Sequence, residues 1–283
     1  MKSLRIGLPS KGRLAEQSAE LLAQAGLSFR RQERSLFARV SEMPVEITFL
    51  RTEDIPVLCA EGAIDLGITG SDLLAEAGVD LIHRLALGIG KCRLSVCVAE
   101  DSACHIPRDL HGKRVATSFP RVTERFFASN HATVHLVPLS GSVEIMISLG
   151  VADAIVDLVE TGSTLAANRL RVLTDVGHYE TLLVQNREQR YPDIADRVVR
   201  RLQGVVVART YSLLEYNIPR ERLAEAEKIT PGYNSPTVSA LEDAAWCAVQ
   251  VMVKRKEVID VMDKLETLGA AAILETQITN CRL

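Results

Sequence analysis

The amino-acid sequence predicts an α/β protein with a small ferredoxin-like module at its C-terminal end. Up to about Gly204, short apolar runs alternate with amphipathic helical patterns, which is typical of crossover units on a largely parallel sheet. From about Val205 the order becomes β-α-β-β-α-β, which describes a ferredoxin-like module. With 283 residues, the chain is long enough for two or three domains.

The first block begins with an apolar strand at 4–8, which residues 9–13 connect to a helix. Leu14, Leu21 and Leu22 share one face of that helix, and Gly26 ends it, as glycine commonly does. The same alternation predicts four further elements: a strand at 45–50, a helix at 54–61, a strand at 63–69 and a helix at 71–77.

A second block begins near Cys92. Apolar runs predict strands at 93–99, 113–118, 133–139 and 181–185, besides one that carries Asp157. Helical spacing predicts helices at 120–129 and 142–149, and a third from Pro192 to Gln203 that ends at Gly204.

In the C-terminal block we expect strands at 205–214, 237–241, 246–253 and 271–278. A helix opens at Pro219. A second, strongly amphipathic helix carries Val258, Val261 and Leu265 on one stripe and closes at Gly269.

Composition excludes several classes of protein. The chain has 33 basic and 36 acidic residues and a net charge of −3, which argues against broad neutralisation of nucleic-acid phosphates but not against small anions. No apolar run approaches a membrane span, and the N-terminus has no signal-peptide core, so we expect a cytoplasmic protein with no membrane partner. The six cysteines form no Cys-x-x-Cys pair, and the six histidines show no triad or zinc spacing.

The strongest chemical signal is the stretch from Ala154 to Leu165. It reads as a buried strand that carries Asp157 and turns through Thr161-Gly-Ser-Thr164 into a helix. Such a turn presents free backbone N–H groups and the positive end of a helix dipole, which suits a phosphate, while Asp157 can accept hydrogen bonds from sugar hydroxyls. The alternative is an ordinary capped turn.

Polar residues also follow other predicted strands, where ligand groups collect in parallel α/β sheets. Each has a plainer interpretation as a solvated basic turn, a helix cap or a complement to a helix dipole. These candidates are Lys11, Arg13, Arg51, Asp72, Thr117 and Glu144.

Taken together, these stretches resemble the long form of the ATP phosphoribosyltransferase family, over essentially the whole chain. The most specific part runs from Gly141 to Leu165 and includes Gly-Ser-Val-Glu144, Asp157-Leu-Val and Thr161-Gly-Ser-Thr-Leu165. Supporting segments are Lys11-Gly-Arg13, Asp65-Leu-Gly-Ile-Thr-Gly70, Gly112-Lys-Arg-Val-Ala-Thr117 and Leu268-Gly-Ala-Ala-Ala-Ile273.

The resemblance implies a catalytic unit similar to type II periplasmic binding proteins, with two lobes around a cleft. Lobe I would comprise residues 1–91 and 184–205, and lobe II residues 92–183. Residues 206–283 would form an ACT-like regulatory domain that binds histidine. A plainer alternative for that domain is an oligomerisation module that needs no ligand.

The resemblance also implies site residues. Asp157, Arg13 and Glu144 would be catalytic, and Asp157 with Glu160, Thr161, Gly162, Ser163 and Thr164 would bind phosphoribosyl pyrophosphate (PRPP). Lys11, Arg13, Arg51, Asp72 and Thr117 would contact ATP. Asn217, Ser235, Thr237 and Ala272 would bind the effector.

The implied reaction is attack of adenine N1 of ATP on C1 of PRPP, the first step of histidine biosynthesis, with histidine as feedback inhibitor. Mg²⁺ would be the cofactor, held chiefly by substrate phosphates; the sequence does not identify its protein ligands. The partners would be further copies of the chain, from dimer to hexamer. Two rival functions stay open: a ligand sensor without chemistry, and a phosphoribosyltransferase that acts on another base.

Overall fold

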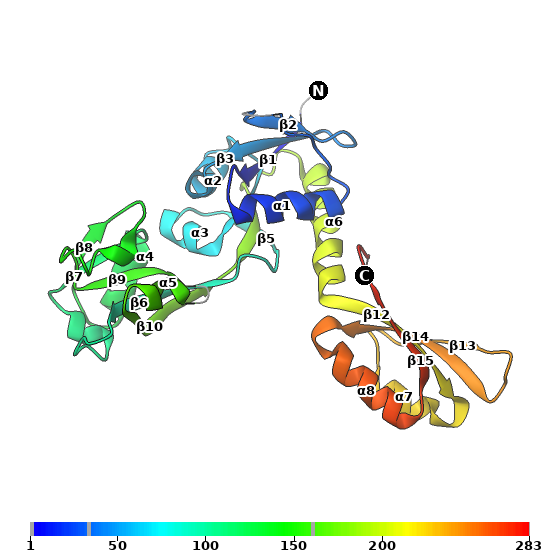
Figure 1. Ribbon diagram of the computed structural model, residues 1–283. Coiled ribbons are helices and arrows are strands. Elements are labelled where there is room, and N and C mark those ends of the chain that lie inside the picture. The colour runs from blue at the N-terminus through cyan, green and yellow to red at the C-terminus, as the bar shows by residue number, and fades with distance from the viewer. Residues whose placement is uncertain (1–2, 33–34, 160–161, 283) are drawn as a thin grey trace. The chain divides into compact units, whose positions relative to one another are not determined.

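The computed structural model describes residues 3–32, 35–159 and 162–282. The chain divides into two compact units (Figure 1). Unit 1 consists of Met1–Glu20 and Leu27–Asp196, and unit 2 of Leu21–Gly26 and Arg197–Leu283. Within the described ranges, no helix is both long enough and apolar enough to cross a membrane.

Unit 1 contains two sheets. The first has the strand order β2-β3-β1-β4-β11-β5. Its strands are β1 (Leu4–Pro9), β2 (Phe37–Arg39), β3 (Val45–Leu50), β4 (Leu66–Gly70), β5 (Ile82–Ala86) and β11 (Thr181–Gln185). β1 pairs in parallel with β3 and β4, whereas β11 runs antiparallel to β4 and β5. The helices of this part are α1 (Arg13–Gln24), α2 (Ile55–Ala60) and α3 (Ser71–Ala77).

The second sheet of unit 1 has the order β10-β6-β9-β7-β8. Its strands are β6 (Cys92–Ala99), β7 (Arg114–Thr117), β8 (His135–Pro138), β9 (Ala154–Val159) and β10 (Leu170–Tyr179). The accompanying helices are α4 (Pro120–Ser129) and α5 (Ser163–Ala167). Buried Val96, Val115, Phe127 and Val156 form its core. β9 therefore lies in the middle of this sheet with core residues on both of its faces, which fixes the position of Asp157.

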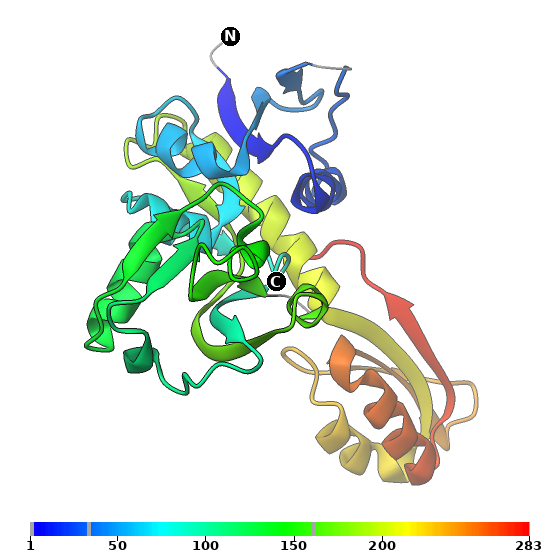
Figure 2. The ribbon, with the colours of Figure 1, turned by 60° about the vertical axis from the view of Figure 1, so that its left-hand side comes forward.

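Unit 2 carries the second half of the long helix α6 (Pro192–Thr210) and a four-stranded sheet of order β13-β14-β12-β15. The sheet consists of β12 (Tyr211–Pro219), β13 (Thr237–Ala240), β14 (Trp246–Lys254) and β15 (Ala271–Gln277), with helices α7 (Leu223–Ile229) and α8 (Val258–Leu268). The two helices cover one face of this sheet (Figure 2), and Leu214, Val249 and Leu265 belong to the buried core of this part. The predicted fold class is confirmed, including the β-α-β-β-α-β order of the C-terminal part.

Several predicted elements were wrong in detail. Residues 205–210 are helical instead of starting a strand, because Gly204 lies inside α6. A Cβ atom at Gly204 would overlap the backbone oxygen of Cys281, so this glycine permits close packing of the C-terminal segment and does not end the helix. The predicted helix at 142–149 is only a 3₁₀ turn, Val143–Ile145. Strands β2, β5 and β10 were not predicted.

The expected domain boundaries also differ from the elements. β11 begins at Thr181 and pairs with β4, so the chain returns to the first sheet before residue 184. The boundary expected between residues 205 and 206 lies within α6.

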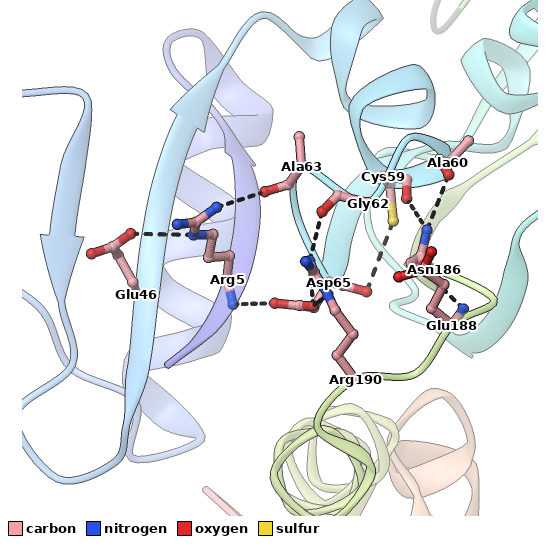
Figure 3. A network of polar contacts seen from close by, with 10 residues as sticks. All are labelled: Arg5, Glu46, Cys59, Ala60, Gly62, Ala63, Asp65, Asn186, Glu188 and Arg190. Atoms are coloured by element: carbon pink, nitrogen blue, oxygen red, sulfur yellow. Dashed lines mark hydrogen bonds and ion pairs between the residues drawn. The ribbon is translucent and has the colours of Figure 1, made fainter. Parts of the chain in front are cut away.

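A buried carboxylate fastens the returning segment to the first sheet (Figure 3). The Asp65 side chain is 5% exposed; its Oδ2 accepts the backbone N–H of Arg5 at 2.8 Å, and its Oδ1 accepts Nε of Arg190 at 2.9 Å. Nearby, Nδ2 of Asn186 donates to the carbonyl oxygens of Cys59 (2.7 Å) and Ala60 (3.1 Å). Residues after β11 are thereby bonded to the end of α2 and to Asp65 in the turn before β4, and Asp65 in turn is bonded to β1.

Asp65→Ala should lower the free energy of unfolding by about 1–2 kcal/mol, because it leaves the partly buried N–H of Arg5 without an acceptor. The partly exposed Arg190 adds little to this cost. Asp65→Asn should cost less, since one oxygen remains. Asp80→Ala is the matched control, because the Asp80–Arg187 pair is exposed and its loss should hardly change stability. Urea unfolding of the three variants measures these effects; equal losses for Asp65→Ala and Asp80→Ala would contradict the role of Asp65.

Candidate functional site

The loop after β9 opens onto a pocket of about 420 Å³ within the second sheet's part of unit 1. It is lined by Glu144, Asp157, Leu158, Val159, Gly162, Ser163, Thr164 and Leu165. Glu160 and Thr161, both predicted to bind PRPP, lie outside the described residues. Every described member of the predicted PRPP set thus lies around one cavity.

The start of α5 has the features expected of an anion site. Gly162 precedes the helix with φ of 80°, a left-handed conformation that favours glycine, and its absent side chain would meet no atom within 4 Å. The first turn of α5 contains no acidic residue. An anion in the pocket would therefore meet the positive end of a helix dipole without a competing carboxylate from that turn.

Asp157 lies at the pocket wall with a perturbed pKa. Burial raises the pKa of its carboxyl, the backbone N–H of Leu158 (2.8 Å from Oδ1) lowers it, and the negative charge of Glu144 raises it again. Glu144 affects the pKa of Asp157 because both carboxylates line the same pocket. Together they provide hard oxygen acceptors for hydroxyl groups or for the water shell of a cation.

Lys11, Arg13 and Arg51 come to one edge of the first sheet. Pro9 and Leu50 are paired at the ends of β1 and β3, so the residues that follow them leave the sheet side by side. All three cations are exposed. The loop between β1 and α1 is fixed by Ser10, whose N–H donates to the carbonyl of Leu50 at 2.7 Å.

Sequence reasoning missed Arg31 at this edge. Nη1 of Arg31 donates to the Ser10 carbonyl at 2.7 Å, and its guanidinium lies 4.0 Å from the centroid of the Phe49 ring. An arginine held by an aromatic ring and a backbone carbonyl adds a positioned charge beside Lys11. No local pattern marks it, because Arg31 lies in a connection and meets Ser10 only through the fold.

Asp72 and Thr117 are both buried at strand-to-helix junctions. Asp72 lies in the first turn of α3, where burial raises its carboxyl pKa and the N–H groups of Leu73 and of Asp72 itself lower it. The Thr117 hydroxyl accepts the N–H of Phe119 at 2.9 Å and lies 3.2 Å from the Thr123 hydroxyl. Thr117 is fully buried, so its side chain shapes the turn into α4.

Three of the four predicted effector residues line one pocket of about 330 Å³ in unit 2. Asn217, Thr237 and Ala272 lie on the sheet face away from α7 and α8, whereas Ser235 is an exposed residue outside this lining. Glu215 and Gln250, which sequence reasoning missed, complete the polar wall, with Gln250 Nε2 donating to Glu215 Oε1 at 2.9 Å. Glu215 and Gln250 alternate with buried core residues along β12 and β14, and this alternation is the sequence pattern that could have placed them on the open face of the sheet.

Within the described ranges, no group of three or more His, Cys, Asp or Glu side chains gathers in a way that could hold a metal. The pocket after β9 offers two carboxylates, Glu144 and Asp157. This set fits a Mg²⁺ ion that keeps its waters and is held mainly by phosphates, because magnesium rarely relies on an all-protein cage.

The fold and the site define a two-lobed α/β unit with anion-binding junctions, joined to a small α+β module. The family model described as "ATP phosphoribosyltransferase" matches residues 51–204, and the one described as "HisG, C-terminal domain" matches residues 208–280. An ATP phosphoribosyltransferase of Rhodopirellula baltica is 65% identical over 280 residues, covering 99% of this chain and 94% of the relative. One from Saccharopolyspora erythraea is 42% identical and covers 99% and 100%.

Among solved structures, a chain of the "ATP phosphoribosyl transferase (HisG:HisZ) complex from Thermotoga maritima" superimposes with a TM-score of 0.64 at 30% identity, covering 72% of this chain and 98% of that one. The chain described here belongs to the ATP phosphoribosyltransferase family. It is therefore a pentosyltransferase of the first step of histidine biosynthesis.

Glu144→Gln should lower the pKa of the Asp157 carboxyl, because it removes a nearby negative charge, while burial still keeps that pKa above its ordinary value. A carbon-detected NMR titration of the Asp157 carboxyl measures the change. Asp153 is the internal reference: the Arg114 backbone N–H, 2.9 Å from its Oδ2, lowers its pKa, and Glu144 plays no part. An unchanged Asp157 titration in Glu144→Gln would show that the two carboxylates do not share a site.

Proposed function

We propose that this enzyme transfers the 5-phosphoribosyl group of PRPP to N1 of ATP, giving phosphoribosyl-ATP and pyrophosphate. The N1 lone pair forms a bond to C1 of the ribose as the bond from C1 to the pyrophosphate oxygen breaks, and pyrophosphate leaves with that electron pair. The observation that carries the proposal is the pocket in which Asp157 and Glu144 face the start of α5. Family membership supports the choice of substrates.

The pocket suits a phosphorylated pentose at both ends. The 5-phosphate would be bound by the backbone N–H groups and hydroxyls of Ser163 and Thr164 at the positive end of α5. Asp157 would accept hydrogen bonds from the ribose hydroxyls, and Glu144 would orient the ribose or a metal-bound water. Glu160 and Thr161 stay in the proposed PRPP set on the basis of the sequence motif.

The cations of the first sheet would act on the leaving group and on ATP. Lys11, Arg13 and Arg51 lie at adjacent strand ends, where their charges offset those of pyrophosphate and of the ATP phosphates. Asp72, at the next strand, would face the purine. Thr117 would contribute to the ATP site through the turn into α4 that its hydroxyl organises. Mg²⁺ would neutralise pyrophosphate when bound.

Little general-base chemistry is needed, because N1 of adenine already carries a lone pair. Catalysis would come mainly from positioning the two substrates and from stabilising the departing charge. This agrees with the described lining of the pocket, which includes two carboxylates and no histidine.

Asp157→Asn should reduce kcat by about tenfold to a hundredfold, since it replaces charge-assisted hydrogen bonds to the ribose by weaker neutral ones. Absorbance of phosphoribosyl-ATP, followed with ATP, PRPP and Mg²⁺, measures the rate, and chelation of Mg²⁺ should abolish it. Asp101→Asn, an exposed carboxylate of the same lobe, is the control. Near-normal turnover of Asp157→Asn would refute the ribose role. Binding of PRPP without turnover by the unchanged enzyme would favour a ligand sensor. Turnover with another base only would favour a phosphoribosyltransferase that acts on that base.

We further propose that histidine binds at the pocket around Asn217, Thr237 and Ala272 and inhibits the enzyme, with Ser235 contributing from the adjacent loop. Glu215 offers an acceptor for the amino group, and Thr237 and Gln250 offer polar groups for the rest. The pocket lies on a sheet face that α7 and α8 leave uncovered, which suits a site completed by another copy of the chain in a dimer or hexamer.

Thr237→Val should raise the histidine concentration for half-inhibition by about tenfold while the uninhibited rate stays unchanged, because only one hydrogen-bonding hydroxyl is removed. Thr267→Val, on α8, is the control, since that threonine is not part of the pocket lining. Inhibition curves at fixed substrate measure the effect, and sizing with and without histidine reports the assembly. Equal histidine inhibition curves for Thr237→Val and Thr267→Val would contradict this site. They would mean that histidine binds elsewhere or that the C-terminal part is only an oligomerisation module.

A further inference from the structure

Helix α3 follows a strand of the first sheet, yet it is attached to elements of the second. Leu73 and Ala75 of α3 pack against the core of the second sheet. At its start, the N–H of Ser71 donates to the carbonyl of Glu180 at 2.9 Å, and the Ser71 hydroxyl accepts the Glu180 N–H at 3.1 Å. The start of this short helix is therefore bonded to the connection between β10 and β11, while Leu73 and Ala75 pack on the second sheet.

The carboxylate of Glu76, near the C-terminal end of α3, caps α4 of the second lobe. Its Oε1 accepts the backbone N–H of Arg121 and its Oε2 that of Val122, both at 3.0 Å. Pro120, the first residue of α4, has no N–H, and Phe119 before it supplies no side-chain cap. The two remaining free donors of that first turn are thus both bonded to one side chain from the other lobe.

This contact is favourable for two independent physical reasons. Each hydrogen bond joins a charged acceptor to a donor that has no partner within its own helix, and such bonds are stronger than neutral ones. The carboxylate also lies at the positive end of the α4 dipole.

Beside it, Gly78 ends α3 in a left-handed conformation, and the Arg121 guanidinium occupies the space that a side chain at Gly78 would need.

We propose that Glu76 is a positioning residue that fastens α4 to α3 and thereby holds the strand-to-helix junctions at Asp72 and Thr117 in a fixed relative position. α3 carries Asp72 at its start, and α4 begins just after the turn built on Thr117. Because the Glu76 carboxylate joins these two helices, it fixes the separation of the Asp72 and Thr117 junctions. The inference rests on the proposed ATP site for its kinetic consequence, but the contact itself is independent of it.

Loss of the carboxylate should release the first turn of α4. In Glu76→Ala, hydrogen exchange of the Arg121 and Val122 amides should accelerate by about tenfold or more, since each loses a charge-assisted hydrogen bond. Glu76→Gln retains one acceptor oxygen and should show a smaller acceleration. The KM for ATP should rise severalfold in Glu76→Ala and less in Glu76→Gln, because the Asp72 and Thr117 junctions must then be brought to their correct relative position when ATP binds. In both variants kcat at saturation should stay within about twofold.

The matched control is Glu124→Gln, an exposed carboxylate on the same helix, which should leave both quantities unchanged. Glu76→Gln remains informative if Glu76→Ala fails to fold. Unchanged exchange at Arg121 and Val122 would overturn the proposal. So would faster exchange with an unchanged KM for ATP, or a fall in kcat without a change in KM. If the unmodified enzyme shows no turnover of ATP and PRPP, the proposed function fails, whereas the exchange experiment still decides whether Glu76 holds α4.

Discussion

The backbone N–H groups at the starts of helices impose one constraint on the whole catalytic unit: each needs an acceptor. In α3, the N–H of Ser71 donates to the backbone carbonyl of Glu180 at 2.9 Å. In α4, Glu76 reaches across from the other lobe. The first turn of α5 contains no acidic side chain, and a pocket opens there instead. The same physical need is therefore met by a backbone carbonyl at α3 and by a side chain from the other lobe at α4, and it leaves a candidate anion site at α5.

Strand topology determines where the other candidate site residues lie. β1, β3 and β4 run in parallel, so the segments that follow them leave from one edge of the first sheet. That edge carries Lys11, Arg51 and Asp72. Asp157 is supplied by a strand in the middle of the second sheet, whose core fixes its direction. The exposed cations and the pocket carboxylates thus come from different sheets of unit 1.

Errors of the sequence prediction have identifiable causes. Gly204 looks like a helix end but allows the Cys281 backbone to approach the middle of α6. β10 escaped notice because its residues are half-buried almost throughout and irregularities interrupt its pairing with β6, so no clear alternation marks it. β2 is only three residues long and lies at the sheet edge. Tertiary packing, and not local preference, decides all three.

The sequence by itself determined the α/β class, the C-terminal β-α-β-β-α-β order and the loop after Asp157, because periodicity, glycine placement and a strand-turn-helix motif are local properties. Only the tertiary structure decided that Arg31 lies beside Ser10, that Glu215 and Gln250 line the same pocket as Asn217 and Thr237, and that Glu76 caps α4. These residues are distant along the chain, and nothing in their own neighbourhoods encodes the partner. Their contacts exist because sheet order and helix packing bring separate segments within hydrogen-bonding distance.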